Sequence, residues 1–321
     1  MRHSLYWDDF NRRAKETVTC LQAGNEVPVR RVSVFITEKC NMACSYCNHP
    51  KSNAELPESS FSDIVNKYGS QAIIHITGGE PSLVSWLYPY LEKNGAANRF
   101  HLNTNMLILP PAKSIKRLKV SLDSCDEEYW NKLVGKNSFR TVVDNIKKCL
   151  KDTVLSITYT MTRENYQQIP KFISFANSEL KGLYAIFFSV YKGVNKRFVF
   201  SDKDVSLFFN KVKPLMNAML DTESDALLNE TITEKFRMMQ GIRFPENTSS
   251  TCYLSLSERV FTPNGNVSGC SHLVRDGVTN KPGEKHEKCR YGCNRRLVAF
   301  NEYVEHTINI SSIRSCFLDT I

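Results

Sequence analysis

Six short runs rich in apolar and β-branched residues recur through the first two-thirds of the chain. The runs cover residues 32–36, 72–76, 100–102, 118–122, 153–161 and 183–190. Their nearly continuous apolar character is typical of strands buried on both faces of a parallel sheet. Between them, residues 141–150 and 165–180 carry one-sided apolar stripes at helical spacing. Strands that alternate with helices predict right-handed βα units, and six units are too few for a closed eight-stranded barrel.

We therefore expect an α/β fold, a partial (β/α)6 barrel with its chemistry at the C-terminal ends of the strands. After residue 200 the pattern changes. Residues 205–220 predict a helix interrupted near Pro214, residues 231–240 a second helical piece, and Asn264–Gly265 a hairpin turn. Residues 251–321 are rich in cysteine and short of periodic apolar segments. The expected division is an N-terminal extension (1–29), the barrel (30–200), a helical connector (201–250) and a small C-terminal cysteine-rich metal-binding domain (251–321).

Composition limits the class of protein. Of the 321 residues, 41% are hydrophobic and 23% charged, as in soluble globular proteins. There is no apolar run of the ~18 residues that a membrane span needs, and the N-terminus is too charged for a secretory signal, so a cytoplasmic protein without membrane contact is expected. The net charge of +9 is spread along the chain. Spread charge is typical of a solvated surface more than of a nucleic-acid interface, although charge alone leaves that question open.

Seven of the eleven cysteines fall into two groups. Because the cytosol keeps thiols reduced, such grouping indicates metal binding. The first group, Cys40, Cys44 and Cys47, directly follows the first predicted strand. A zinc ion or a 4Fe–4S cluster normally takes four protein ligands, and only three are present here. The loop is either a zinc site that borrows a fourth ligand or a cluster with one open iron.

The stretch CNMACSYC (40–47) resembles the CxxxCxxC motif of the radical S-adenosylmethionine (SAM) superfamily, including the aromatic Tyr46 before the last cysteine. The resemblance implies that the three thiolates hold three irons of a 4Fe–4S cluster and that the fourth iron binds SAM. The segment TGGEP (77–81) matches the GGEP motif of that family. It implies that Gly78, Gly79 and Glu80 receive the amino group of SAM. The resemblance covers roughly residues 30–195.

Further SAM contacts are implied at the ends of the third and fourth predicted strands, at Asn103, Ser121 and Asp123. Many relatives pair an arginine with the SAM carboxylate where this chain has Val134, and Lys136 or Arg140 is a candidate substitute. Cys125, just beyond the fourth strand, is either a hydrogen-atom donor, as in epimerases of this superfamily, or a small residue that fills a loop.

The second group contains Cys252, Cys270, Cys289 and Cys293, with Gly265 placed four residues before Cys270. This pattern resembles the opening of the SPASM and twitch domains of radical SAM enzymes. It implies a second, fully ligated 4Fe–4S cluster, which favours electron transfer or structural support. The alternative is a structural zinc site with four cysteine ligands.

The resemblance implies an enzyme that cleaves SAM reductively and abstracts a substrate hydrogen atom, with a flavodoxin- or ferredoxin-type electron donor. An auxiliary cluster favours net oxidation, so we expect a radical SAM oxidoreductase that dehydrogenates a small molecule such as a sugar or aminocyclitol. The alternative is a maturase that crosslinks, epimerises or oxidises a ribosomal peptide or protein. The segment before the first run is too short for a peptide-recognition domain. A remote alternative is a non-enzymatic iron–sulfur or zinc protein that binds nucleic acid.

Overall fold

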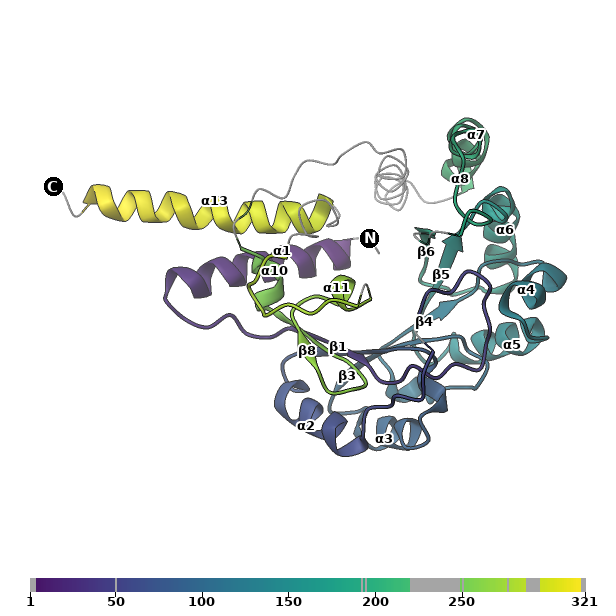
Figure 1. Ribbon diagram of the computed structural model, residues 1–321, viewed down its shortest axis with the longest axis horizontal. Coiled ribbons are helices and arrows are strands. Elements are labelled where there is room, and N and C mark those ends of the chain that lie inside the picture. The colour runs from purple at the N-terminus through teal and green to yellow at the C-terminus, as the bar shows by residue number, and fades with distance from the viewer. Residues whose placement is uncertain are drawn as a thin grey trace.

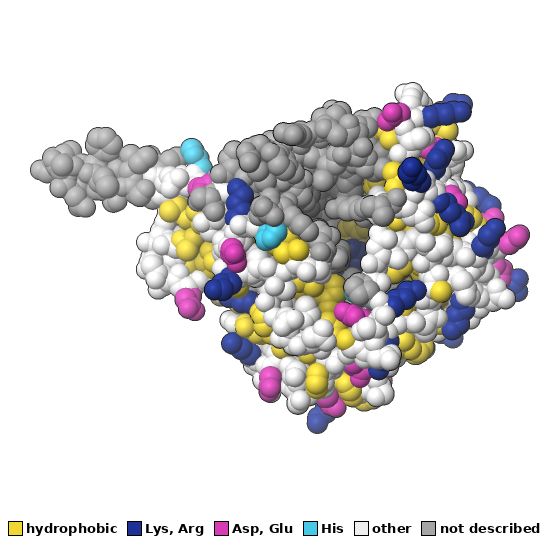
Figure 2. Space-filling model, viewed as in Figure 1, with side chains coloured by type: hydrophobic (Ala, Val, Ile, Leu, Met, Phe, Trp, Pro, Cys, Tyr) yellow, Lys and Arg dark blue, Asp and Glu magenta, His cyan; other side chains and the backbone are white. Residues whose placement is uncertain are grey.

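The computed structural model describes residues 4–49, 51–191, 193, 195–219, 249, 251–275, 277–286 and 295–318. Figure 1 shows its central feature, a sheet curved into an open arc with helices along the outer side. None of the helices described is long and apolar enough to cross a membrane. On the face shown in Figure 2, Lys and Arg side chains lie scattered among acidic ones and form no continuous patch.

Six parallel strands build most of the sheet, in the order β6-β5-β4-β3-β2-β1. They are β1 (Arg31–Phe35), β2 (Ile73–Thr77), β3 (Arg99–Thr104), β4 (Arg117–Ser121), β5 (Val154–Met161) and β6 (Ala185–Val190). The helices between them are α2 (Glu58–Tyr68), α3 (Leu87–Asn94), α4 (Glu127–Val134), α5 (Phe139–Cys149) and α6 (Ile169–Glu179), with short 3-10 turns at Pro81–Leu83, Ala112–Ser114 and Tyr166–Gln168. The predicted α/β partial barrel is confirmed, with each strand within about two residues of its expected place.

The two faces of this sheet differ in chemistry. On the face that the helices cover, strand residues such as Val34, Ile74 and Leu118 are fully buried. They pack in one core with helical residues such as Phe61 of α2 and Phe172 of α6. Because side chains alternate along a strand, the other residues of each strand point to the inner side of the arc (Figure 1). That inner side is where polar strand residues lie.

The sheet continues beyond β1 with two strands from the C-terminal part of the chain. β7 (Glu258–Phe261) pairs parallel with β1, and β8 (Val267–Ser268) pairs antiparallel with β7. The hairpin predicted at Asn264–Gly265 is confirmed, and Gly265 has the positive φ of 78° that favours glycine in such turns. The C-terminal segment thus shares the sheet of the barrel. The four-part division of the chain stays a prediction.

Two long helices pack together at the open side of the arc (Figure 1). They are α1 (Ser4–Gln22) and α13 (Arg295–Leu318), and the short α10 (Tyr253–Leu256) packs with them. Ala14 and Val18 of α1 meet Leu254 of α10 and Phe300 and Val304 of α13 in a second small core. Helix α13 was not expected, because residues 251–321 looked poor in periodic apolar segments.

After β6 the chain forms α7 (Asp202–Leu207), a π-helical turn (Phe208–Val212) and α8 (Lys213–Met219). Ser201 starts α7 with a capping box in which its side chain and that of Asp204 bond reciprocally. The interruption predicted near Pro214 is confirmed as the π turn directly before α8. The helical piece predicted at 231–240 lies outside the described residues. A short helix α11 (Ser271–Arg275) follows β8.

Candidate active site at the ends of the parallel strands

The three clustered cysteines lie in the loop that follows β1, at the C-terminal edge of the sheet. Cys40 and Cys47 are exposed and Cys44 is half-buried. Burial, followed by the charge of Asp123 and of the two other thiols, raises the pKa of Cys44 to about 12. Burial also raises the pKa of Cys40, with Glu80 and Cys47 adding to the effect. The three thiols therefore lie within electrostatic reach of one another.

Within the described part of the chain, no three His, Cys, Asp or Glu side chains converge where one metal ion would bind. A zinc loop requires such convergence, because all ligands lie about 2.0–2.3 Å from a single ion. Thiolates that bind separate irons of a cluster lie further apart. The soft thiolate donors of Cys40, Cys44 and Cys47 and their open position fit a 4Fe–4S cluster.

The two glycines of the GGE segment bring it against the backbone just before the first cysteine. A Cβ on Gly78 would lie 2.4 Å from the Thr37 carbonyl oxygen, and one on Gly79 would lie 2.2 Å from the Lys39 carbonyl oxygen. The N–H of Gly79 donates to Thr37 at 2.7 Å, and the N–H of Glu80 donates to Lys39 at 2.7 Å. The glycines therefore allow the two loops to pair, which sets where Cys40 begins its turn.

The Glu80 carboxylate is buried and ties together the loops after β2 and β3. It accepts hydrogen bonds from Thr104 Oγ1 at 2.8 Å and from the backbone N–H groups of Asn105 and Ser82 at 2.7 and 3.0 Å. Burial nevertheless raises its pKa. A carboxylate has about four lone-pair sites, so one remains for an ammonium group beside Cys40. The proposed contact of Glu80 with SAM stays a prediction.

Asp123 is fully buried directly after β4, and both of its carboxylate oxygens bond to protein. Oδ2 accepts the hydroxyl of Tyr46, and Oδ1 accepts the N–H of Thr160 at 2.5 Å. Burial raises the pKa of Asp123 to about 6, opposed by these two hydrogen bonds. The Tyr46 ring packs edge-on against Tyr191 and Phe198. Tyr46 and Asp123 thus hold the cysteine loop, and in this structure neither polar group points to open space.

Asn103 and Ser121 lie on the inner side of the sheet near its C-terminal edge. Asn103 Nδ2 donates weakly to Thr77 Oγ1 at 3.4 Å, and its buried amide also interacts with the imidazole of His75. Ser121, the last residue of β4, is exposed. The contacts of Asn103 and Ser121 with SAM stay predictions.

The two candidate substitutes for the missing arginine have different surroundings. Val134 is fully buried in the core. Lys136 Nζ lies 3.4 Å from the carbonyl oxygen of Asn41, inside the cysteine loop. Arg140 is 83% exposed and bonds Glu127, on the outside of the helical layer. Lys136 therefore lies beside the site and Arg140 does not.

Cys125 packs against the hydrophobic core. Burial raises its pKa, and the charge of Lys171 of α6, in the outer layer of helices, opposes that shift. This placement supports its interpretation as a residue that fills the loop.

Several loop-holding residues were missed from the sequence. The N–H groups of Ala43 and Ser45 donate to the carbonyl oxygens of Val134 and Leu133, both at 2.9 Å. Asn105 Nδ2 donates to Asn41 Oδ1 at 2.7 Å. Asn41 lies inside the cysteine motif and Asn105 directly follows β3. No residue pattern in the sequence predicts that their side chains form a hydrogen bond.

The second cysteine group is only partly described. Cys252 is buried at the start of α10, among the apolar residues of the second core. Cys270 is half-buried after β8. The segments that carry Cys252 and Cys270 pack closely against each other, because a Cβ added to Gly269 would lie 3.1 Å from the Cβ of Ser255. Cys289 and Cys293 lie outside the described residues. The second cluster and the twitch-like domain therefore stay predictions.

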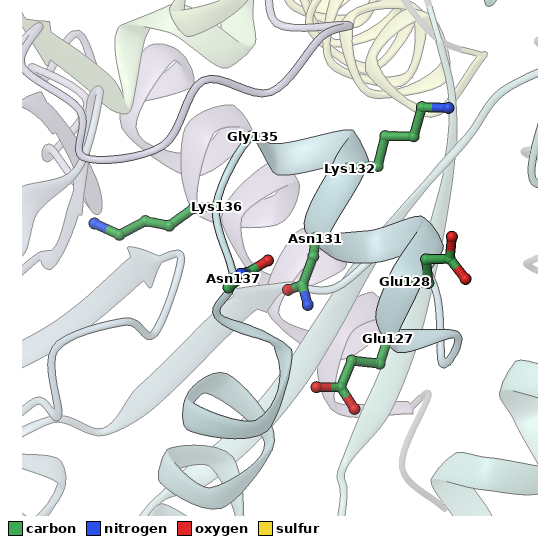
Figure 3. A pocket seen from close by; sticks show the side chains of 7 residues that line it. All are labelled: Glu127, Glu128, Asn131, Lys132, Gly135, Lys136 and Asn137. Atoms are coloured by element: carbon green, nitrogen blue, oxygen red, sulfur yellow. The ribbon is translucent and has the colours of Figure 1, made fainter.

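The pocket shown in Figure 3 lies outside the barrel, along α4. Its volume is about 720 Å³, and Lys132, Gly135 and Lys136 are among its lining residues. Lys132, Lys136 and Glu128 point away from one another instead of toward a common centre (Figure 3). Without convergent groups this pocket is not an active-site candidate.

Comparisons with known proteins agree with this geometry. The model of the radical SAM superfamily matches residues 34–176, the stretch that holds the end of β1, the cysteine loop, GGE and β2 to β5. GTP 3',8-cyclase of Clostridium acetobutylicum is 32% identical over 145 residues, which is 40% of this chain and 45% of that protein. A probable GTP 3',8-cyclase of Methanosarcina mazei is 24% identical over 89% of this chain and 91% of its own length. The chain spans about half the length of most of the first curated relatives it matches.

Two solved structures share the fold. Streptococcus suis SuiB bound to precursor peptide SuiA aligns with a TM-score of 0.58 and 14% identity over 89% of this chain and 69% of that chain. anSMEcpe with bound AdoMet aligns with a TM-score of 0.56 and 15% identity over 88% and 84% of the two chains. At this identity the likeness shows the fold alone.

Proposed function

We propose that this chain, whose residues 34–176 match the model of the radical SAM superfamily, is an enzyme that binds a 4Fe–4S cluster and SAM and begins its reaction by taking a hydrogen atom from a substrate. When bound, these groups supply an electron that splits SAM into methionine and a deoxyadenosyl radical, which abstracts the hydrogen atom. The observation that carries the proposal is the group of three thiols at the strand ends, beside a GGE loop that pairs with their loop.

The chain's own residues would hold and orient the cofactors. Cys40, Cys44 and Cys47 supply three thiolates and leave one coordination position of a cluster open to an exchangeable ligand. Asn103 lies at the same edge of the sheet, near the end of β3, and Glu80 offers negative charge beside Cys40. The polar inner face of the arc would receive the substrate, since in parallel α/β folds ligands bind at the C-terminal strand ends.

The step after hydrogen abstraction has two candidates. Net oxidation follows if a second cluster at Cys252, Cys270, Cys289 and Cys293 accepts an electron from the substrate radical, which then loses a proton. Ring closure or rearrangement is favoured by the names of the curated relatives, GTP 3',8-cyclases. Product mass separates them, because oxidation removes two hydrogen atoms whereas rearrangement leaves the composition unchanged.

The cluster also needs a source of electrons, for which we propose a flavodoxin- or ferredoxin-type protein. Dithionite can replace that protein in a first test. The purified chain is reconstituted anaerobically with iron and sulfide, reduced with dithionite and supplied with SAM. About eight irons per chain and release of 5'-deoxyadenosine are expected.

The matched variants are Cys44→Ala and Cys149→Ala. Cys44→Ala removes a ligand, so deoxyadenosine release should be lost, whereas Cys149, buried on the outer side in α5, is not a ligand and its variant should retain it. Bound zinc without SAM cleavage in the wild-type protein would contradict the proposal. Equal activity in the two variants would contradict the assignment of the cysteines.

A further inference from the structure

The inner face of the six parallel strands contains basic residues and no acidic ones. The alternate positions that point away from the helices include the basic or imidazole side chains of Arg31, His75, Arg99, His101, Arg117 and Lys119. The other inner-face positions of β1 to β6 carry no Asp or Glu. The outer face, by contrast, is apolar and buried. The +9 charge of the chain, which looks dispersed along the sequence, is thus gathered in part inside the arc.

The strand register places these residues next to one another. His75 pairs with His101, His101 with Arg117, and Asn103 with Lys119. Arg31 Nη2 lies 3.4 Å from His75 Nδ1. Burial lowers the pKa of His75 well below its ordinary value, and the charges that lower it further are those of Arg31, Lys119 and His101. The charged neighbours that act on this imidazole are all cations.

The cationic ends of the β4 side chains are held in place by aromatic rings. The Arg117 guanidinium lies 5.2 Å from the centre of the Phe187 ring and 5.5 Å from that of Tyr184. Lys119 Nζ lies 4.9 Å from the Phe187 ring centre. Arg117 Nη2 also donates to Ser156 Oγ at 3.3 Å. Such contacts order long side chains before a ligand arrives and reduce the entropy lost on binding.

The position of these basic residues along their strands separates them from the C-terminal edge of the sheet, where the cysteine loop lies. Arg31 and Arg117 open β1 and β4, while the cysteine loop and Ser121 lie at the far ends of the same strands. A strand rises about 3.3 Å per residue, so the Cα atoms of Arg31 and Arg117 lie about 13 Å from these strand ends, and that of Lys119, two residues from Ser121, lies about 7 Å away. A molecule with its reacting carbon near SAM and an anionic group at its other end would span this distance.

We propose that Arg117 and Lys119 on the inner face, whose cationic ends share the Phe187 ring, bind an anionic group of the substrate, a phosphate or a carboxylate. The proposal rests on the proposed function, because it takes the inner face as the substrate site. Glu258 of β7 lies beside Arg31 in the register and bonds Arg13, whereas β4 and its neighbours β3 and β5 carry no carboxylate on this face. The neighbouring cations Arg117 and Lys119 therefore gain from an anion both by Coulomb attraction and by relief of their mutual repulsion. Burial is the main cause of the low pKa of His75, and the neighbouring positive charges lower it further.

The test uses the reconstituted protein and two probes, inorganic pyrophosphate and succinate, in anaerobic isothermal titration calorimetry at low salt. At least one probe should bind, and Arg117→Gln and Lys119→Gln should each weaken its Kd by about tenfold or more. Lys93→Gln, an equal charge change on the outer face of α3, should leave the Kd unchanged. Tighter binding of pyrophosphate assigns the group as phosphate, and tighter binding of succinate assigns it as carboxylate.

Lys119→Arg keeps the positive charge and should retain binding. If Lys119→Gln fails to fold, the Arg variant still tests whether the charge at this position matters. The proposal is overturned if neither probe binds the wild-type protein, if Lys93→Gln weakens binding as much as Lys119→Gln, or if Lys119→Arg loses it. Release of deoxyadenosine from SAM by the wild-type protein is measured beside these titrations. Anion binding without SAM cleavage would overturn the proposed function alone, and cleavage without anion binding would overturn this inference alone.

Discussion

The hydroxyl of Tyr46, in the cysteine loop, donates to the buried carboxylate of Asp123, 77 positions later in the chain. This bond links the loop after β1 to the end of β4. In the sequence, Tyr46 lies between two of the proposed cluster ligands, Cys44 and Cys47. The position of the thiols therefore depends on a residue three strands away in the sheet.

Tyr46→Phe tests this link. The ring contacts with Tyr191 and Phe198 are kept while the hydrogen bond to Asp123 is lost. We expect a loss of about 2 kcal/mol in the free energy of unfolding, because a buried carboxylate loses a donor. Urea denaturation of the metal-free protein measures it. Tyr303→Phe, at a ring that is 46% exposed, serves as the control and should change stability by less than about 0.5 kcal/mol. Equal losses in both variants would refute the link.

Gly79→Ala tests the pairing of the GGE loop with the cysteine loop. The added methyl group would meet a backbone oxygen at 2.2 Å, so the segment before Cys40 has to move. We expect a large fall in the iron bound after reconstitution. Gly24→Ala is the control, since Gly24 has a positive φ of 69° but open space around its Cβ. It should cost about 1 kcal/mol of stability and leave iron content unchanged. Normal iron content in Gly79→Ala would contradict the role assigned to this glycine.

The side chain of Arg13 links α1 to the start of β7. Its Nη2 donates to Glu258 Oε1 at 2.9 Å and to Ser257 Oγ at 2.7 Å, and its side chain is only 7% exposed. Arg13→Met leaves a largely buried carboxylate unpaired and should cost about 3 kcal/mol in the free energy of unfolding. The comparison is Lys147→Met, which breaks an exposed ion pair with Glu179 and should cost less than about 1 kcal/mol. Similar costs in urea denaturation would show that burial does not decide the strength of the Arg13 pair.

Glu16 predicts an acid-dependent part of stability. Its hydrogen bond and ion pair with Arg30 lower the pKa of its carboxyl below the ordinary 4.5. A folded-state pKa below the unfolded value stabilises the fold above the unfolded pKa, and this contribution is lost as the pH falls through the folded pKa. Wild type should therefore exceed Glu16→Gln in stability by a constant amount from pH 6 to 8, and the difference should shrink below about pH 4.5. Denaturation midpoints across this range check it, and a difference independent of pH would refute it.

Cys270→Ala tests the proposed second cluster. If Cys252, Cys270, Cys289 and Cys293 hold four irons, the variant should bind about four irons in place of about eight and still cleave SAM. Iron analysis together with deoxyadenosine release measures both properties. Cys20→Ala, a change outside both cysteine groups, should keep the full iron content. Bound zinc in the wild-type C-terminal site, with no iron lost in the variant, would favour the structural zinc alternative.

Local patterns in the sequence predicted much of the fold. The strand runs are confirmed because an apolar strand buried on both faces has a recognisable composition, and the turn at Asn264–Gly265 because its backbone needs a residue such as glycine. Helix α13 was missed because its apolar residues, such as Phe300 and Val304, face a partner helix from the other end of the chain. The pairing of β7 with β1 was missed because no local pattern encodes a contact between distant strands.

By itself the sequence determined the alternation of strands and helices, the group of three cysteines after the first strand and the glycines of the second loop, because each depends on neighbouring residues. Only the tertiary structure decided which distant groups meet. In the folded chain the Asp123 carboxylate accepts the hydroxyl of Tyr46, and the Gly79 backbone lies against Lys39. Arg31, Arg117 and Lys119 lie on one face of the sheet. The physical reason is that curvature and register of a parallel sheet bring together side chains whose separation along the chain carries no information about their distance in space.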